Sequence, residues 1–445
     1  MAHGLVSTLL DWFQKLSPAF TQPSWRNALI VFLGWIQICG GHAVTGALVA
    51  AGVAGRRHHA AFHRFFSRGA WSTDAVGQLL FRSIVSLLPR DAMIEVVVDD
   101  TLTKKSGPKI FGLGTHVDPV MSTLHYKVLA FGHVWVVVSV VVMVPFSRRP
   151  WALPVLFRLY RSKADCARRQ ARHRTKTELA REMLTVLAGW VGDRRMRVAL
   201  DSAYSNGPVL LGMMEKMTFI GALRPDAALY AVPVYPGHGR RRVYGDQLPN
   251  PKQILTDPRY PWHTCKVVLY GRRKTIHYKT VDAYWLRVAR RQLVRAVCVR
   301  SPGDAKTRAF FSTDPTMSVP EILMTYAKRW STEVCFRDLK QELGFADSQA
   351  RTRKAVERTA PFVGYCYTTL VLWFAAGAWQ SPLAKPPLRP WYPHKQQLCF
   401  ADIVRCARRA LDHFDVLDLE RSLEALRASD EALARHGPDA VELAA

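Results

Sequence analysis

The chain has 445 residues and a net charge of +27, because 62 Lys and Arg stand against 35 Asp and Glu. Hydrophobic residues make up 49% of the sequence, which excludes an intrinsically disordered protein. So large a positive excess indicates a polyanionic partner, most simply nucleic acid, with an anionic membrane as the alternative. The eight cysteines are scattered with no close pair, which argues against a zinc knuckle and favours reduced thiols in a cytosolic protein.

Residues 1–90 have the pattern of a helical region. The apolar stretch 28–54 contains polar side chains and several glycines, which disfavour a membrane span and favour a small helical domain. Residues 45–51 and 56–66 are spaced like a helix-turn-helix whose second helix carries arginines and histidines. A helical hairpin that binds nothing has the same spacing, so both interpretations stay open.

From residue 91 the pattern changes to strands. Residues 94–100 (IEVVVDD) form a β-branched run that ends in Asp99 and Asp100. Such a strand end is a common way to present metal ligands in α/β folds, although a capped strand end has the same pattern. A second strand is predicted over 109–116. The valine-rich stretch 125–145 approaches membrane length but is interrupted by polar residues, which favours a buried central strand or strand pair.

Residues 161–191 are predicted to form a long helix that begins with many basic residues. The next segment, 196–206 (MRVALDSAYSN), is again a short apolar strand that ends in a carboxylate, Asp201. The pattern of a strand, an acid and a turn of small residues therefore occurs twice, which makes a capped strand end a weaker explanation.

The segment 218–315 has short alternating strands separated by prolines and glycines, which is typical of an all-β region. It contains two basic clusters, Arg240–Arg242 and Arg272–Lys274, among several tyrosines and tryptophans. Cations beside aromatic rings suit contact with phosphates and stacking of bases, although an ordinary solvated hairpin has the same composition.

A long helix is predicted over 318–345. Ser318 and Glu321 have the spacing of a capping box at its start. At about 100° per residue, two stripes run along this helix. The apolar stripe contains Leu323, Ala327, Trp330 and Val334. The polar stripe contains Tyr326, Arg329, Glu333 and Lys340. After residue 351 the chain is again helical in pattern.

Three carboxylates come from separate elements: Asp99 or Asp100, Asp201, and Glu333. Hard divalent cations prefer oxygen ligands, and two such ions can hold the attacking and leaving oxygens of a phosphoryl transfer. If folding gathers these acids, the sequence predicts a site for two Mg²⁺ ions, with cations of the same helix beside it to hold DNA phosphates.

The polar stripe has the pattern Y-x2-R-x3-E-x6-K. This pattern resembles the signature of bacterial DDE transposases of the insertion-sequence-four superfamily. The flanking FFSTDP and F-x-D-L-K-Q-x-L-G-F runs are similar to that family as well. The D-x-T at Asp99 and the D-S-x-Y at Asp201 resemble its other two acidic motifs, so the resemblance covers residues 91–350.

The resemblance implies an α/β fold with an RNase H-like catalytic core and a β-rich insertion before the last acidic residue. Five regions are implied: a helical N-terminal DNA-end-binding region (1–90), the first part of the core (91–217), the β-rich insertion (218–315), the last core helix with the catalytic Glu (316–365) and a helical C-terminal region (366–445).

The family further implies a transposase, a metal-dependent endonuclease and DNA strand transferase that moves an insertion sequence by cut-and-paste transposition. Asp99, Asp201 and Glu333 would be its catalytic residues and the ligands of two Mg²⁺ ions, for which Mn²⁺ would substitute, with Asp100 as the alternative first ligand. Its partners would be double-stranded DNA, as inverted-repeat ends and as target, and a second copy of the chain in a homodimeric DNA complex.

Nine residues are predicted to contact DNA. The resemblance assigns Tyr326, Arg329 and Lys340 to phosphates near the cleaved end. The remaining candidates are Lys104, Lys105, Arg241, Arg273, Trp262 and Trp285, with the two tryptophans as candidates for flipping a base. Lys104 and Lys105 fit a solvated loop equally well.

Two other interpretations are retained. A catalytically inactive or domesticated DNA-binding protein or repressor, derived from a transposase, would keep the binding surfaces without cleavage. An integral membrane protein would be built around 28–54 and 125–145. The favoured interpretation has no membrane association and places the protein in the bacterial cytoplasm, with the nucleoid.

Overall fold

The computed structural model describes residues 2–107, 109–123, 125–300, 308–387, 389–391, 397–412 and 414–418. The chain divides into two compact units. Unit 1 consists of residues 1–79, 109–111 and 338–445, and unit 2 consists of residues 80–108 and 112–337.

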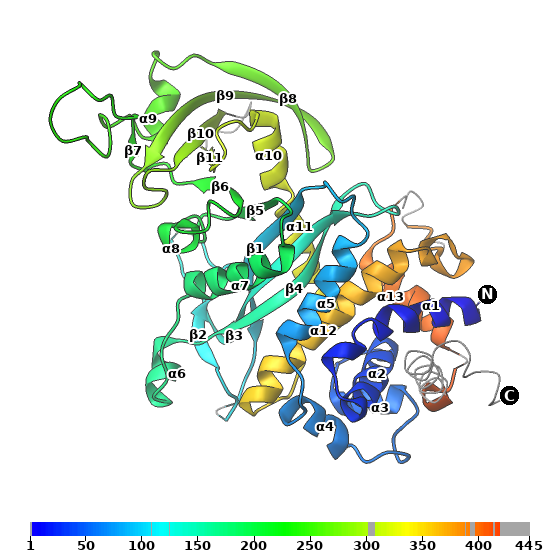
Figure 1. Cartoon of the computed structure of the whole chain (residues 1–445). Helices are drawn as coiled ribbons and strands as arrows, with labels where there is room; N and C mark the ends of the chain where they lie inside the picture. The colour runs from blue at the N-terminus through cyan, green and yellow to red at the C-terminus, as the bar shows by residue number, and fades with distance from the viewer. Residues whose placement is uncertain are drawn as a thin grey trace, which may run out of the picture. The chain divides into compact units, whose positions relative to one another are not determined.

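Unit 1 is helical in its described part. Its elements are α1 (Ala2–Gln14), η1 (Ser17–Ala19), α2 (Gln22–Gln37), α3 (Val44–Ala50), α4 (Ala60–Ser67), the first part of α5 (Thr73–Val85), α12 (Arg353–Ala375), η2 (Ala378–Gln380), η3 (Pro382–Ala384) and α13 (Phe400–Leu411). Helix α12 forms its centre, because every side chain from Thr359 to Phe374 is buried. It packs against α1, α4 and α13 (Figure 1).

The predicted helix-turn-helix is not formed. Helix α3 ends at Ala50 and α4 begins at Ala60, so the connection is far longer than the three or four residues that the motif uses. Gly52 and Gly55 both have positive φ, which bends the chain in this connection. The arginines and histidines at 56–59 therefore lie in a loop before α4. DNA-end binding by this region stays a prediction.

Unit 2 is built on an eleven-stranded sheet. Its strands are β1 (Ile94–Lys104), β2 (Gly114–Val117), β3 (Leu129–Met143), β4 (Pro150–Tyr160), β5 (Met196–Leu200), β6 (Thr218–Leu223), β7 (Leu229–Tyr230), β8 (His263–Leu269), β9 (Arg272–Trp285), β10 (Leu293–Arg300) and β11 (Arg308–Ser312). The strand order is β2-β3-β1-β5-β6-β11-β10-β9-β7, while β4 pairs with β3 and β8 pairs with β9.

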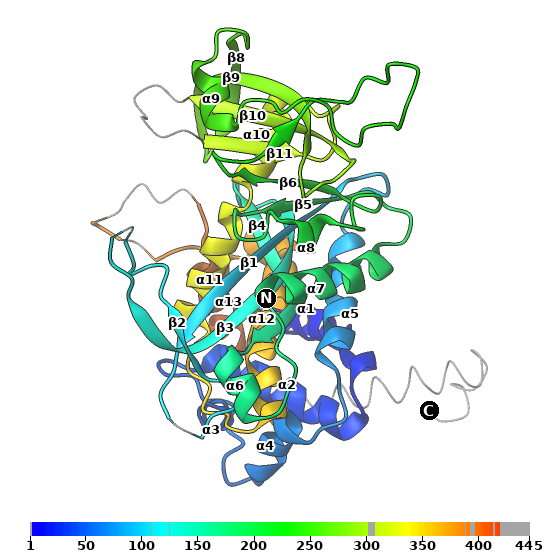
Figure 2. The same cartoon turned by 90° about the vertical axis from the view of Figure 1, so that its left-hand side faces the viewer.

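The middle of this sheet has the arrangement of an RNase H-like core, which confirms the predicted fold class. Strands β4, β3 and β1 pair antiparallel, and β1, β5 and β6 pair parallel. Helix α7 (Lys176–Val191) packs across β3 and β4 (Figures 1 and 2). The valine-rich stretch is the single long strand β3, which is buried from His133 to Val141. No helix among the described residues is long and apolar enough to cross a bilayer.

Several elements differ from the sequence-based expectation. The predicted long helix at 161–191 is two helices, α6 (Lys163–Arg168) and α7, separated by residues 169–175. The predicted strand at 109–116 is the short β2. Strand β4 was not predicted, because its Pro150 and Pro154 argue against a paired strand. In the structure it pairs with β3, and the register of this pairing shifts beside Pro154, between Val138 and Ser139 of β3.

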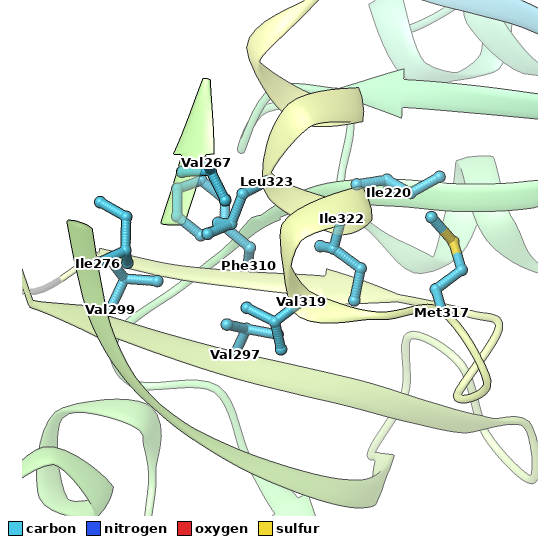
Figure 3. Close-up of a cluster of buried hydrophobic side chains, with 10 residues drawn as sticks. All are labelled: Ile220, Val267, Ile276, Val297, Val299, Phe310, Met317, Val319, Ile322 and Leu323. Carbon is cyan, nitrogen blue, oxygen red and sulfur yellow. The ribbon is translucent and has the colours of Figure 1, made fainter. Parts of the chain in front are cut away.

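The β-rich segment continues the core sheet, because β11 pairs with β6. Its strands pack against helix α10 (Val319–Ala327) through a buried apolar cluster (Figure 3). The cluster consists of Ile220, Val267, Ile276, Val297, Val299, Phe310, Met317, Val319, Ile322 and Leu323. Burial of each such aliphatic side chain contributes about 1.5–3 kcal/mol. Helix α10, which begins the segment with the Y-x2-R-x3-E-x6-K pattern, is therefore packed against the β-rich segment. The remaining helices of unit 2 are α8 (Gly207–Leu210) and α9 (Pro251–Thr256).

The predicted continuous helix over 318–345 is wrong. It divides into α10 and α11 (Trp330–Glu342), and the backbone N–H groups of Arg329, Ser331 and Thr332 each bond the carbonyl three residues earlier. This tighter winding rotates α11 away from the stripe that 3.6 residues per turn would give. Trp330, which was expected on the apolar face, is consequently 53% exposed, while Ser331 and Thr332 are buried.

Candidate active site

Two of the predicted acids lie where β1 and β5 stop pairing in parallel: Asp99 in the middle of β1, which continues to Lys104 beyond the predicted strand, and Asp201 directly after β5. Val98 of β1 pairs with Leu200 of β5, and the next residues are Asp99 and Asp201. The carboxyl ends of parallel strands are where open α/β sheets present functional groups. The strand register therefore brings together two side chains that are a hundred residues apart in the sequence.

Asp99 and Asp100 point to opposite faces of β1, as successive strand residues do. The Oδ2 of Asp99 accepts a hydrogen bond from Nη1 of Arg329 at 2.8 Å. Asp100 contacts the opposite face, where Oδ2 meets Nζ of Lys176 and Oδ1 accepts the Tyr204 hydroxyl, both at 2.7 Å. Of the two aspartates, Asp99 is the one that faces Arg329.

The turn after β5 is shaped by Asp201 itself. Its Oδ1 accepts the backbone N–H groups of Ala203 at 2.9 Å and Tyr204 at 3.0 Å. An aspartate that bonds the backbone two residues on is the usual organiser of such a turn. The small residues Ser202 and Ala203 let the chain reverse closely there, which keeps the carboxylate at the strand end.

Arg329 contacts one predicted acid on β1 and another on helix α11. Its Nη1 contacts Asp99, and its Nη2 contacts Oε1 of Glu333 at 2.8 Å, four residues later along the chain. The Arg329 side chain is 17% exposed. The guanidinium thus lies between two of the three predicted metal ligands and neutralises part of their charge.

Burial governs the electrostatics of this cluster. It raises the pKa of Asp99 to about 7; the Arg329 guanidinium opposes this shift and nearby Asp201 adds to it. Burial also raises the pKa of Asp201. Burial works against the charge of Arg329, yet Asp99, Tyr326 and Glu333 outweigh it and raise the pKa of the guanidinium. Carboxylates with raised pKa values beside a specific cation are typical of functional sites.

The donor set of this cluster suits a hard divalent cation, since it consists of carboxylate oxygens. The present geometry does not yet enclose one: among the described residues, no group of three or more His, Cys, Asp and Glu side chains is arranged to hold a metal ion.

The other signature residues lie along the same segment. Tyr326 is half-buried against Phe310, with ring centroids 4.7 Å apart, and the Arg329 guanidinium lies 5.8 Å from its ring. Lys340 lies later on α11, in the part of the helix that belongs to unit 1. Lys104, at the end of β1, forms an ion pair with Asp118 at 2.9 Å.

Lys105 is half-buried directly after β1, and its backbone N–H bonds the carbonyl of Phe131. This contact fixes the chain as it leaves the strand.

The predicted DNA contacts of the insertion have different environments. Arg241 and Arg273 are exposed, and the Arg241 guanidinium lies 4.8 Å from the ring of Tyr235. Trp262 is 42% exposed and has Lys279 over its ring at 4.8 Å. Trp285 is only 4% exposed and packs against Phe311, so a base cannot stack on it without a rearrangement of the core.

Sequence reasoning missed an aromatic pair beside the acids. Tyr270, at the tip of the β8–β9 hairpin, contacts Trp330, with ring centroids 6.3 Å apart. The two residues are 60% and 53% exposed, and Trp330 directly follows Arg329. The Tyr270–Gly271 turn was a signal for a hairpin tip, but nothing in the sequence predicted that this tip meets α11.

Sequence reasoning also missed the anchors of the site. Lys328 contacts both carboxylate oxygens of Glu95 at 2.6 Å, which ties the junction of α10 and α11 to the start of β1. Lys176 and Tyr204 hold Asp100 on the other face of that strand.

Comparison with known proteins agrees with this geometry. A family model described as "DDE superfamily endonuclease" matches residues 15–280, more than half of the chain, and contains Asp99 and Asp201. A second model, described as "Archaeal putative transposase ISC1217", matches residues 282–371 and contains Glu333. A comparison with curated proteins finds no match. The chain therefore belongs to the DDE superfamily of endonucleases and is a DDE-type insertion-sequence transposase.

Proposed function

We propose that this transposase cuts DNA at the ends of an insertion sequence and transfers the freed strand to target DNA by a cut-and-paste route. The observation that supports this most is the meeting of Asp99, Asp201 and the Arg329–Glu333 pair where β1 and β5 stop pairing in parallel. Three acids from separate elements beside a signature arginine are expected of metal-dependent phosphoryl transfer.

Asp99, Asp201 and Glu333 are the proposed catalytic residues and metal ligands. Enzymes of the DDE superfamily typically use divalent metals, and we propose Mg²⁺ in a two-metal site, with Mn²⁺ as a substitute. When bound, the metal would lower the pKa of a water molecule and polarise the scissile phosphate. Asp99 is preferred to Asp100 as the first ligand, because Asp100 is engaged by Lys176 and Tyr204 on the opposite face.

Arg329 has two roles in this proposal. In the free protein it separates and neutralises Asp99 and Glu333. On DNA binding it turns to a phosphate near the cleaved end, which opens the space between the two carboxylates. A guanidinium presents several donors in a rigid fork, so it suits a carboxylate pair and a phosphate equally well.

The remaining DNA contacts follow the sequence prediction with one change. Tyr326, Lys340, Lys104, Lys105, Arg241 and Arg273 are proposed to hold phosphates. Trp262 and the Tyr270–Trp330 pair, in place of the buried Trp285, are proposed to stack on bases near the cleaved end. Two chains would act as a homodimer on two inverted-repeat ends, in the cytoplasm with the nucleoid.

A cleavage assay tests the proposed function. The purified chain is incubated with a labelled duplex that carries the end of its element, with Mg²⁺ or with a chelator. Glu333→Gln should abolish metal-dependent nicking and leave end binding intact. Glu342→Gln, the same substitution later on helix α11, is the matched control and should nick normally. Nicking by Glu333→Gln at the wild-type rate would remove Glu333 from the site.

The alternative is an inactive relic or repressor that binds DNA without cutting it. The Arg329 bridge is the observation that favours it, because permanent ion pairs of Arg329 with Asp99 and Glu333 would exclude a metal. End binding by the wild type without nicking in either Mg²⁺ or Mn²⁺ would support this alternative.

A further inference from the structure

One segment of unit 2 concentrates positive charge outside the candidate active site. Residues 158–182, which comprise the end of β4, helix α6 and the first half of α7, contain nine Lys and Arg but only three Asp and Glu. The nine cations are Arg158, Arg161, Lys163, Arg168, Arg169, Arg172, Arg174, Lys176 and Arg181. More than a fifth of the net charge of the chain therefore lies in a small fraction of its length.

The first acid, Asp165, is surrounded by more cations than it can neutralise. It is 1% exposed and meets Nε of Arg161 at 2.7 Å, Nε of Arg169 at 3.1 Å and Nη2 of Arg168 at 3.3 Å. A buried carboxylate with three arginines leaves two positive charges in excess. It also restricts the arginine side chains, so a ligand that binds them meets a partly ordered cluster.

The other two acids are likewise engaged without balancing the charge. Glu182 contacts both Arg158 and Arg174. Glu178 closes the capping box of α7 with Thr175 and lies 3.9 Å from Arg172. The side chains of Arg168 and Arg172 are 71% and 85% exposed, so their charge faces solvent.

One residue of this segment contacts β1 next to the position of Asp99. Lys176, at the start of α7, contacts Asp100 at 2.7 Å, and Asp100 is the neighbour of Asp99 on β1. Asp100 points to the face of β1 opposite Asp99, so this segment lies on the side of the sheet that α7 covers.

We propose that Lys163, Arg168, Arg169, Arg172 and Arg174, here called the α6 surface, bind the phosphodiester backbone of duplex DNA. The inference rests on the proposed function and deepens it. Arginine forks match phosphate oxygens, and contacts to phosphates position a duplex without reading its sequence. The α6 surface therefore contributes affinity and salt dependence, and leaves the choice of the terminal repeat to other parts of the chain.

The test is a salt titration of DNA binding. Anisotropy of a labelled duplex that carries no end sequence is measured between about 50 and 200 mM salt for the wild type and for Lys163→Ala/Arg168→Ala/Arg172→Ala. Each lost phosphate contact lowers the slope of log affinity against log salt by about 0.9, so the triple variant should lose about 2.7. Its affinity at moderate salt should fall more than about tenfold.

The matched control removes three exposed cations elsewhere in unit 2. Arg195→Ala/Lys216→Ala/Arg291→Ala changes the net charge equally and should keep most of the slope. Far-ultraviolet circular dichroism confirms that both triple variants fold. If the first triple variant does not fold, Arg172→Glu, at a side chain that is 85% exposed, takes its place and should weaken binding in the same direction.

The outcomes separate the inference from the proposed function. A wild-type chain that nicks element ends, together with a triple variant that keeps the wild-type slope and affinity, overturns the α6 surface alone. A steep loss of slope in the control overturns it as well, because the effect would then reflect net charge. A wild-type chain that binds no DNA overturns both proposals.

Discussion

The two parts of the sheet in unit 2 present polar side chains in opposite ways. In the middle of β1 and directly after β5 the acids are half-buried and each has a fixed partner: Arg329 for Asp99, and the backbone of the following turn for Asp201. On the β8–β9 hairpin, Tyr270 and the basic residues 272–274 are exposed. The two acids are thus held in fixed positions, while the exposed side chains of the hairpin can adjust to a ligand.

The largest expected effect separates the two neighbouring aspartates of β1. Asp99→Asn should lower nicking of element ends by about 10³-fold, because it removes a proposed ligand worth several kcal/mol. Asp100→Asn is the matched control on the opposite face and should retain most activity while the protein loses stability. Single-turnover nicking measures the first effect and urea unfolding the second. Equal activity losses in both variants would contradict the assignment of Asp99.

The second effect is a pH dependence of stability. The pKa of Asp99 is raised from 3.8 to about 7, so the folded chain binds this proton more tightly than the unfolded chain does. The contribution of Asp99 to stability is therefore greatest below about pH 4 and is lost as the pH rises toward 7. Asp99→Asn should gain stability over the wild type through that window, by up to about 4 kcal/mol. Urea unfolding with a chelator measures this difference, and parallel pH curves for the two proteins would contradict it.

The third effect belongs to the exposed hairpin. Tyr270→Ala and Trp330→Ala should each weaken binding of an end with an unpaired base by about 1–3 kcal/mol, the usual size of a base stacked on an aromatic ring. Stability should change little, because both rings are more than half exposed. Tyr126→Ala, 70% exposed and outside the pair, is the control. Unchanged affinity for DNA in both variants would mean that Tyr270 and Trp330 contact each other at the surface and do not bind DNA.

The smallest effect tests whether fixed partners hold Asp100 of β1 in place. Tyr204→Phe removes the hydroxyl that donates to Asp100 and leaves the ion pair with Lys176 intact. The free energy of unfolding should fall by about 1.5 kcal/mol, the lower end for hydrogen bonds to a charged group. Nicking should stay within a few-fold of the wild type, and a larger loss would mean that Asp100 takes part in the reaction.

The fold class and the DDE family could be predicted because both are written in local motifs. Apolar strands that lead to acids, and the spacing of Tyr326, Arg329, Glu333 and Lys340, are visible without knowledge of the packing, although β1 continues past its acids to Lys104. The buried β3 was predictable for a similar reason, because its apolar run is interrupted only by residues that a strand tolerates.

The remaining features depend on tertiary contacts. A helical wheel assumes constant winding, so it could not predict the tight turn at Arg329 that exposes Trp330. Nor does local sequence say that Trp285 packs inside the insertion while Tyr270 reaches α11. The ion pair between Arg329 and Asp99 joins residues more than two hundred positions apart, and only the folded chain brings them together.

Successive side chains of β1 point to opposite faces of the sheet, so the position of a residue along the strand decides whether it faces Arg329. Asp99 and Asp100 differ by one peptide unit, so the gain or loss of a single codon upstream in the strand would exchange their faces. Pairing with β3 on one side and β5 on the other makes such a slip costly, because every valine from 96 to 98 would leave its place in the core. Pairing with the two flanking strands thus fixes which of the two aspartates faces Arg329.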